Sequence, residues 1–437
     1  MHTQVLAKAL TSTFAAVMTG KGTGAISTIQ VFGDSAQTII KKIFKSATAK
    51  PPTLKAGKIL LGTITDGTET IDHVTIGCEG PDNFAINCHG NPLIVEMIMQ
   101  LLAKEGAKPL TSEQLLTKIL SSQKQLNTIA VEAKLAQPKA KTIQGSKIIA
   151  NQIDAGLSKK IEQWQQNINK LSLNEISAEA DEILTNSQIA KLIIFGCKVA
   201  IIGPPNTGKS TLLNYLAGRQ KAIVTDIKGT TRDWVSAQCR IEPLYVELID
   251  TAGLDEKLAA APENIVEKES QQKSVEILQK ADLVLLILDN SQTEEQLDEH
   301  LLEKISSTGF QPVKTRPSLS RAKSMGWPCH PVLTVLNKSD LPSKFNISKL
   351  PQKLNNAVLI SAKYGNGIEN LCEKIRQICG VADFDLHSPV CFTDRQENLL
   401  KQIKNTISTR QSASIITELL NGQAGNRHCE EHSDEAI

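Results

Sequence analysis

The residues with the clearest chemical purpose lie between positions 203 and 211. The segment GPPNTGKST follows an apolar run, KVAIIG (198–203), and precedes a helical pattern, TLLNYLAG (211–218). A glycine-rich turn between a strand and a helix lets successive N–H groups converge on phosphate oxygens, and the helix N-terminus adds positive potential. Lys209 can neutralise charge on β- and γ-phosphates, and Ser210 offers a ligand for Mg²⁺. The segment predicts a phosphate-binding loop, with contacts from Asn206, Thr207, Gly208, Lys209, Ser210 and Thr211.

Three motifs downstream stand at the ends of apolar runs. Asp250 in DTAG (250–253) can hold Mg²⁺ through water, and the Gly253 N–H can turn toward a γ-phosphate. Asp340 in NKSD (337–340) can accept hydrogen bonds from N1–H and N2–H₂ of guanine, whereas adenine offers no such donor pair. GTP is therefore favoured over ATP. The predicted base-binding residues of NKSD and of SAK (361–363) are Asn337, Lys338, Asp340, Ser361, Ala362 and Lys363.

A threonine-containing segment, KGTTRD (228–233), lies between the phosphate-binding loop and DTAG. A switch threonine there can complete the Mg²⁺ shell only when the γ-phosphate is present. We therefore expect Ser210, Thr231 and Asp250 to form the Mg²⁺ site, and Lys209 and Thr231 to take part in hydrolysis. The order of these five motifs predicts a GTPase.

These motifs require a scaffold that places them at one edge of a sheet. Between residues 197 and 362 apolar runs alternate with polar helical stretches, which predicts a parallel sheet with crossover helices. The strand candidates are KVAIIG (198–203), VELID (246–250), DLVLLILD (282–289), PVLTVLN (331–337) and AVLISA (357–362). The pattern predicts an α/β domain over residues 196–383.

The flanking segments have other patterns. Residues 1–112 alternate β-like runs, such as AISTIQVF (25–32) and KILLGTI (58–64), with turns, which predicts an α+β domain. Helical patterns over 113–195 and 384–420 predict two helical halves that pack together, with the α/β domain inserted between them. One stripe is expected on a single helix face in the core: Ile153, Leu157, Ile161, Trp164, Ile168 and Leu171. The apolar set of the second half is Leu399, Leu400, Ile403, Ile407, Ile415, Ile416, Leu419 and Leu420.

Composition limits the classes of function. The 437 residues include 48 Lys and Arg against 46 Asp and Glu, a net charge of +2, so any RNA contact must be local. The nine cysteines form no C-x-x-C pair, which argues against a zinc site and a disulfide framework. No run reaches the about 18 apolar residues of a membrane span, and no signal sequence stands out, so we expect a cytoplasmic protein without a membrane or DNA partner. CHG (88–90) has no partner at metal spacing, so we expect a turn with a satisfied histidine.

Two segments fit this organisation poorly. Residues 305–330 contain no acidic residue but carry Lys314, Arg316, Arg321 and Lys323. They are either a solvated insertion loop before PVLTVLN or a contact for RNA or a partner. Residues 421–437 include a polar, acidic stretch without periodicity, which predicts a disordered tail.

The motifs resemble those of the tRNA modification GTPases called MnmE or TrmE, over residues 14–420. The matching parts are the P-N-x-G-K-S-[ST] loop, IVTDIKGTTRD (223–233), DTAGL (250–254) and NKSD, within a discontinuous helical domain. GKGTGAISTIQVFG (20–33) and INCHG (86–90) resemble parts of that family's folate-binding domain. The resemblance implies a multidomain α/β fold with a folate-binding-like N-terminal domain, a discontinuous α-helical domain and an inserted Ras-like P-loop GTPase domain.

The resemblance also implies a catalytic apparatus. In that family a potassium ion takes the place of an arginine finger, because a fixed cation near the β/γ bridge can neutralise developing charge. The corresponding K⁺ ligands here are Asn206, Thr225, Ile227 and Thr230. A glutamate downstream of DTAG orients the attacking water and corresponds to Glu267. Because AAAPEN (259–264) lengthens this segment, three alternatives stay open, namely Glu256, Glu263 and Glu269.

The family's partners and cofactors follow from the same resemblance. The resemblance implies that the GTPase domains dimerise on activation and that the chain forms a homodimer through its N-terminal domain. It also implies a tetrahydrofolate derivative as one-carbon donor. A flavoprotein would be the partner in modifying the wobble uridine of certain tRNAs. The family's terminal Cys-x-Gly-Lys motif is absent from this sequence, and its stretch before CHG is shortened to 81–90. Two other functions therefore stay open. One is a GTP-dependent binding switch, acting on RNA or in ribosome assembly without folate chemistry. The other is a paralogue that binds GTP without turnover, which follows if Glu267 is not the residue that positions water.

Overall fold

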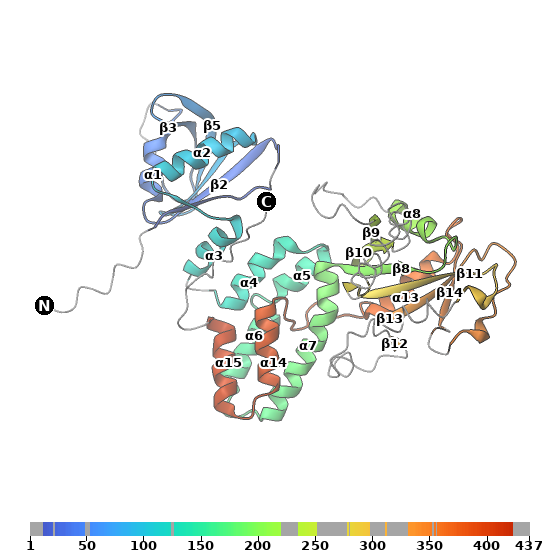
Figure 1. The fold of residues 1–437 in the computed structure, drawn as a ribbon. Helices are drawn as coiled ribbons and strands as arrows, with labels where there is room; N and C mark the ends of the chain where they lie inside the picture. The colour runs from blue at the N-terminus through green and yellow to red at the C-terminus, as the bar shows by residue number, and fades with distance from the viewer. Residues whose placement is uncertain are drawn as a thin grey trace, which may run out of the picture. The chain divides into compact units, whose positions relative to one another are not determined.

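The computed structural model divides the chain into two compact units, Met1–Leu126 and Asn127–Ile437 (Figure 1). The domain bounds expected from the sequence stay predictions. None of the helices among the described residues combines the length and apolarity needed to cross a bilayer. The structure describes residues 12–20, 22–48, 53–123, 126–219, 235–250, 278, 280–297, 311–312, 331–351, 354 and 356–422.

The first unit is a mixed sheet of seven strands with three helices. The strand order is β3-β4-β5-β6-β2-β1-β7, and α1 and α2 pack on the sheet. The strands expected at 25–32 and 58–64 are confirmed as β2 and β4. The strands are β1 (Phe14–Val17), β2 (Ile26–Phe32), β3 (Phe44–Ser46), β4 (Ile59–Thr65), β5 (Thr70–Cys78), β6 (Asn83–His89) and β7 (Lys108–Pro109). The helices are α1 (Ala36–Ile43), α2 (Pro92–Lys104) and α3 (Ser112–Ser122).

The helical part of the second unit is assembled from two stretches of sequence. Helix α14 lies against α7 and helix α15 against α6, so the segments before and after the α/β part pack side by side (Figure 1). Ser172 and Glu175 form a reciprocal capping box that begins α7. The elements are α4 (Thr128–Ala136), η1 (Gln137–Lys139), α5 (Ile143–Asn151), α6 (Gly156–Asn167), α7 (Leu173–Phe195), α14 (Asp394–Lys404) and α15 (Thr409–Asn421).

The expectation of one helix from Ile153 to Leu171 is wrong. Helix α5 ends at Asn151 and α6 begins at Gly156, so Ile153 lies in the turn between them. A Cβ added at Gly156 would lie 2.3 Å from Oε1 of Gln152, so a larger residue there would displace the Gln152 side chain. Leu157, Ile161 and Trp164 are nevertheless buried, and the other three residues of the stripe are partly buried against the same core.

Ile407 is the exception in the second apolar set. Its side chain is 89% exposed because it lies in the connection between α14 and α15 rather than on a helix. The other seven residues of that set are buried as expected.

The α/β part contains the expected parallel sheet. Its order is β12-β13-β11-β8-β10-β9, with β14 also paired to β13. Strand β9 is antiparallel to β10, which the sequence pattern did not predict, and the other pairs are parallel. The strands are β8 (Cys197–Ile202), β9 (Val235–Ile241), β10 (Leu244–Asp250), β11 (Leu283–Asp289), β12 (Gln311–Pro312), β13 (Pro331–Asn337) and β14 (Ala357–Leu359). The helices are α8 (Lys209–Arg219), α13 (Ile368–Cys379), η2 (Glu294–Gln296) and η3 (Ile347–Lys349).

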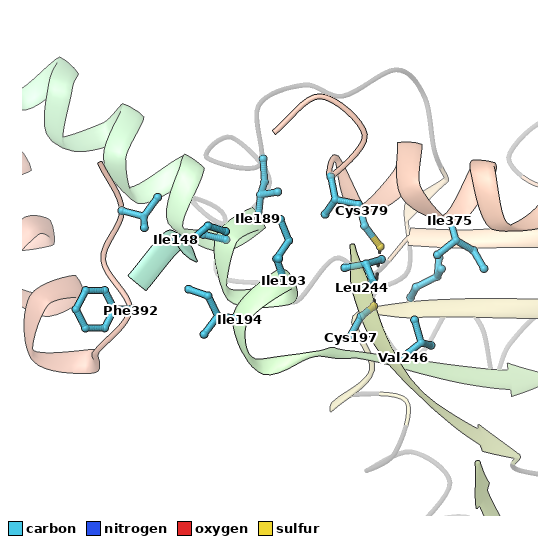
Figure 2. Packing of buried hydrophobic residues seen from close by; sticks show 14 of the residues in the cluster. Ile148, Ile189, Ile193, Ile194, Cys197, Leu244, Val246, Ile375, Cys379 and Phe392 are labelled. Atoms are coloured by element: carbon cyan, nitrogen blue, oxygen red, sulfur yellow. Dashed lines mark hydrogen bonds between the residues drawn. The ribbon is translucent and has the colours of Figure 1, made fainter. Parts of the chain in front are cut away.

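The helical and α/β parts share one hydrophobic core. Figure 2 shows side chains from α7, β8, β10 and α13 meeting where the chain passes from helix to sheet. At this point the sulfur atoms of Cys197 and Cys379 lie 3.9 Å apart. Of the segment 305–330, the structure describes only β12, which pairs with β13; the expected tail beyond residue 422 lies outside the described residues.

Candidate nucleotide-binding site

The loop between β8 and α8 is held by hydrogen bonds to its own carbonyl groups. Nζ of Lys209 donates to the carbonyl oxygens of Gly203 at 2.9 Å and Pro204 at 2.7 Å. The Thr207 hydroxyl also donates to the Pro204 oxygen, at 2.9 Å. The side chains of Lys209 and Thr207 are buried, whereas Ser210 is exposed at the start of α8. This arrangement fixes a curved backbone at a helix N-terminus, the geometry that phosphate oxygens require.

Three residues of this loop have positive φ angles, and the first of them is Gly203, with φ +146°. Asn206 has φ +61° and Gly208 has φ +91°. A Cβ added at Gly208 would lie 2.3 Å from Nδ2 of Asn337, so glycine is required by both the backbone angle and the close approach. Asparagine is one of the few other residues that adopts this conformation readily. The sequence GPPNTGKS therefore matches the backbone that the loop adopts.

Asn337 joins the phosphate-binding loop to the two base-binding motifs. Its Nδ2 donates to the carbonyl oxygen of Thr207 at 2.8 Å, and its Oδ1 accepts from the N–H of Ala362 at 2.9 Å. The side chain is 3% exposed, so both ends of its amide are satisfied within the protein. Three motifs that are far apart in sequence thus meet at one buried amide.

Asp340 lies at the exposed end of the same group of motifs. Its carboxylate accepts a hydrogen bond from the Ser361 hydroxyl at 2.6 Å, and Ser361 is buried. Asp340 is exposed, so its remaining lone pairs can face a ligand. Lys363 is also exposed, and its ammonium lies 5.0 Å from the centre of the Tyr364 ring. The structure therefore brings NKSD and SAK, the two motifs that contain the six predicted residues, into direct contact.

Asp289 is a residue of this site that we did not predict. Its carboxylate lies 2.6 Å from Nζ of Lys338, and the side chain is 7% exposed. Burial would raise the pKa of Asp289, but hydrogen bonds from Lys338 and Ser291 lower it below its ordinary value. The available signal was an acidic residue at the end of the otherwise apolar run LVLLILD (283–289).

The predicted metal sites are described only in part. The backbone of Asp250 pairs with Ile201 of β8, so Asp250 ends its strand beside the start of the phosphate-binding loop. Among the described residues, no group of three or more His, Cys, Asp or Glu side chains could hold a metal ion. The predicted residues outside the described ranges are Thr225, Ile227, Thr230, Thr231, Gly253 and Glu267, together with Glu256, Glu263 and Glu269.

The two segments expected to bind folate are neighbours in the first unit. Ile26 of β2 pairs with His89 of β6, and the N–H of Gly24 donates to the Gly90 oxygen at 3.2 Å. Asp72 accepts from the His89 N–H at 2.8 Å and contacts its Nδ1 at 2.7 Å. Cys88 is buried, and burial raises the pKa of its thiol. His89 is thus held by a carboxylate, and Cys88 belongs to the core.

The fold and the site together define a P-loop GTPase domain. A glycine-rich loop joins a buried parallel strand to a helix, and the guanine-type motif NKSD lies within hydrogen-bonding distance of that loop. Residues 198–316 match the family described as 50S ribosome-binding GTPase, and residues 13–112 match the family described as GTP-binding protein TrmE N-terminus.

Relatives that span nearly the whole chain identify the family. The tRNA modification GTPase MnmE of Endomicrobium trichonymphae is 30% identical over 434 residues, which cover 92% of this chain and 89% of that protein. The protein of the same name from Enterococcus faecalis is 30% identical over 447 residues, covering 94% and 88% respectively. The chain belongs to the MnmE family of tRNA modification GTPases. The solved G domain of the T. maritima FeoB iron transporter is 24% identical and covers 42% of this chain and 98% of its own, with a TM-score of 0.28, which is too low to carry an inference.

Proposed function

We propose that the protein binds and hydrolyses GTP and acts in the modification of tRNA. GTP binding is supported best by the two hydrogen bonds of the Asn337 side-chain amide, which join the phosphate-binding loop to SAK. A nucleotide that contacts the loop through its phosphates then meets Asp340 with its base. Asp340 selects guanine because its carboxylate accepts from N1–H and N2–H₂, and adenine would leave that carboxylate unpaired.

Two cations complete the proposed reaction. Ser210, Thr231 and Asp250 would hold Mg²⁺, which neutralises charge on the β- and γ-phosphates. Asn206, Thr225, Ile227 and Thr230 would hold K⁺, and Glu267 would orient water for attack on the γ-phosphate. The exposure of the Asn206 side chain at the phosphate-binding loop supports its part as a ligand. We also propose that the GTPase domains of two chains dimerise during hydrolysis.

The proposal for tRNA modification rests on the relatives' name and on the N-terminal unit. We propose that the neighbouring segments 20–33 and 86–90 bind a tetrahydrofolate derivative, that the N-terminal units form a homodimer, and that a flavoprotein is the partner in the cytoplasm. The close pairing of β2 with β6 supports a shared site for these two segments. Tetrahydrofolate titration tests this part: saturable binding at micromolar concentration supports it, and its absence favours a GTP-dependent binding switch.

GTP turnover in matched salts tests the proposed hydrolysis. The purified chain is assayed with Mg²⁺ in KCl and in NaCl at equal ionic strength, and we expect much faster turnover in KCl. Lys209→Ala should abolish nucleotide binding or turnover, because Lys209 is the cation of the phosphate-binding loop. Equal rates in the two salts would contradict the K⁺ site, and full activity of Lys209→Ala would contradict the placement of the nucleotide.

A further inference from the structure

Asp289 ends strand β11 next to the motif that is expected to bind guanine. The strand register pairs Asp289 with Asn337, the first residue of NKSD. Its Oδ2 then reaches the ammonium of Lys338, the next residue of the motif, at 2.6 Å. A buried carboxylate and a partly exposed ammonium at this distance form a charge-assisted hydrogen bond.

The Asp289 carboxylate is itself held in one position. Its second oxygen accepts from the N–H of Ser291 at 2.8 Å and from the Ser291 hydroxyl at 2.7 Å. The side chain of Gln296 fixes the backbone of the same residue by accepting from its N–H and donating to its carbonyl oxygen. The carboxylate therefore has a fixed direction, and the direction is toward Lys338.

Lys338 needs such an anchor because its backbone is unusual. Its φ is +62°, and within the described ranges only Asn206 shares a left-handed conformation among residues other than glycine. A lysine stem has four rotatable bonds, and an exposed one samples many rotamers. When the ammonium is fixed at the far end, the stem becomes an extended apolar surface beside Asp340, and a flat purine ring can pack against it.

We propose that Asp289 is a positioning residue for guanine nucleotides, which acts by holding the Lys338 side chain extended along the base site. The inference rests on the proposed binding of GTP. Asp289 does not contact the nucleotide. Its substitution therefore weakens binding of the base without slowing hydrolysis of bound GTP.

A double-mutant cycle on the full chain tests this action through Lys338. The affinity for GDP carrying a fluorescent methylanthraniloyl group is measured for the wild type, Asp289→Asn, Lys338→Met and the double variant. Asp289→Asn keeps the shape and the acceptor for Ser291, and we expect binding about tenfold weaker. The double variant should bind within about twofold of Lys338→Met alone, because the two residues act as one unit. The kcat for GTP at saturation should stay within about twofold for Asp289→Asn.

Matched variants separate this role from a general effect on folding. Glu294→Gln breaks a nearby exposed ion pair with Lys349 and should leave GDP affinity within about twofold of wild type. If Asp289→Asn does not fold, Ser291→Ala takes its place, because it removes one donor to the same carboxylate. It should weaken binding about two- to threefold, and it should not weaken binding further when it is combined with Lys338→Met.

Three outcomes are distinguishable. The inference would be overturned if the affinity losses of the two single variants multiplied in the double variant. It would also be overturned if Asp289→Asn bound labelled GDP as tightly as the wild type. A wild-type chain that does not bind the labelled GDP would instead overturn the proposed function.

Discussion

The side chain of Gln152 connects the helical part to the segment that returns from the α/β part, and its removal should destabilise both. Gln152 is 0% exposed. Its Oε1 accepts from the N–H groups of Leu157 at 2.7 Å and Val390 at 3.1 Å. Its Nε2 donates to the carbonyl oxygens of Ile148 at 2.9 Å and Ser388 at 3.2 Å. One amide thus satisfies buried backbone groups on both sides of the connection.

The structure gives the expected magnitude for Gln152→Leu. Leucine fills a similar volume but leaves the N–H groups of Leu157 and Val390 without their partner. Each buried donor left unsatisfied costs about 1–3 kcal/mol, so we expect a loss of about 2–6 kcal/mol in the free energy of unfolding. Gln166→Leu is the matched control on the exposed face of α6, where a change within about 0.5 kcal/mol is expected.

Urea unfolding followed by the fluorescence of Trp164 measures the difference. Trp164 is buried in α6, and its Nε1 donates to Glu179, so its signal reports on the helical core. Replacing Trp234 and Trp327 by phenylalanine in every variant leaves Trp164 as the only tryptophan. If Gln152→Leu shifted the midpoint no more than Gln166→Leu, the reasoning about the connection would be refuted.

Three further predictions concern the loop, the pH and the thiols. Gly208→Ala should abolish binding of labelled GDP, because the new Cβ would lie 2.3 Å from the amide nitrogen of Asn337; near-normal affinity would contradict this. Burial would raise the pKa of Glu397, but ion pairs with Lys191 and a second lysine lower it to about 2. Because the folded-state pKa is depressed, ionised Glu397 stabilises the folded protein by about 2–3 kcal/mol above pH 4.5, and this stabilisation is lost as the pH falls toward 2. The free energy of unfolding of Glu397→Gln, measured over the same pH range, should not show this loss. Burial raises the pKa of Cys239 to about 12, so mass spectrometry of the labelled native protein should find this thiol unmodified by alkylating reagents at pH 8, and rapid labelling would contradict its burial.

The sequence predicted those parts of the fold that depend on local patterns. Parallel strands buried on both faces read as continuous apolar runs, and β8, β11 and β13 were found for that reason. The antiparallel edge strand β9 was not predicted, because its sequence VSAQCRI contains polar residues that interrupt the apolar run. The break between α5 and α6 was missed because the apolar spacing continues through it. Gln152, which lies in that break, also bonds to Ser388 and Val390, and no local pattern reveals these contacts.

The same distinction applies to the site. The phosphate-binding loop and NKSD are recognisable because their backbone geometry requires particular residues at fixed spacing. Asp289 was missed because a single acidic residue at the end of a strand is ordinary, and only the register of β11 with β13 brings it to Lys338. The motifs themselves can therefore be found in the sequence, whereas a residue that contacts a motif from another strand, such as Asp289, depends on the tertiary pairing of strands.

The connection between the α/β and helical parts has a mechanical consequence. A domain inserted through two flexible linkers could turn freely, but here both crossings are fixed. At the first crossing, the carbonyl oxygen of Ile194 accepts from the N–H of Lys141, and Cys197 follows inside the shared core. At the second, the His387 oxygen accepts from Asn151 while Gln152 holds residues 388 and 390. Because both crossings are buried or hydrogen-bonded, a displacement that begins at the phosphate-binding loop and reaches β8 must move α7 or break these bonds.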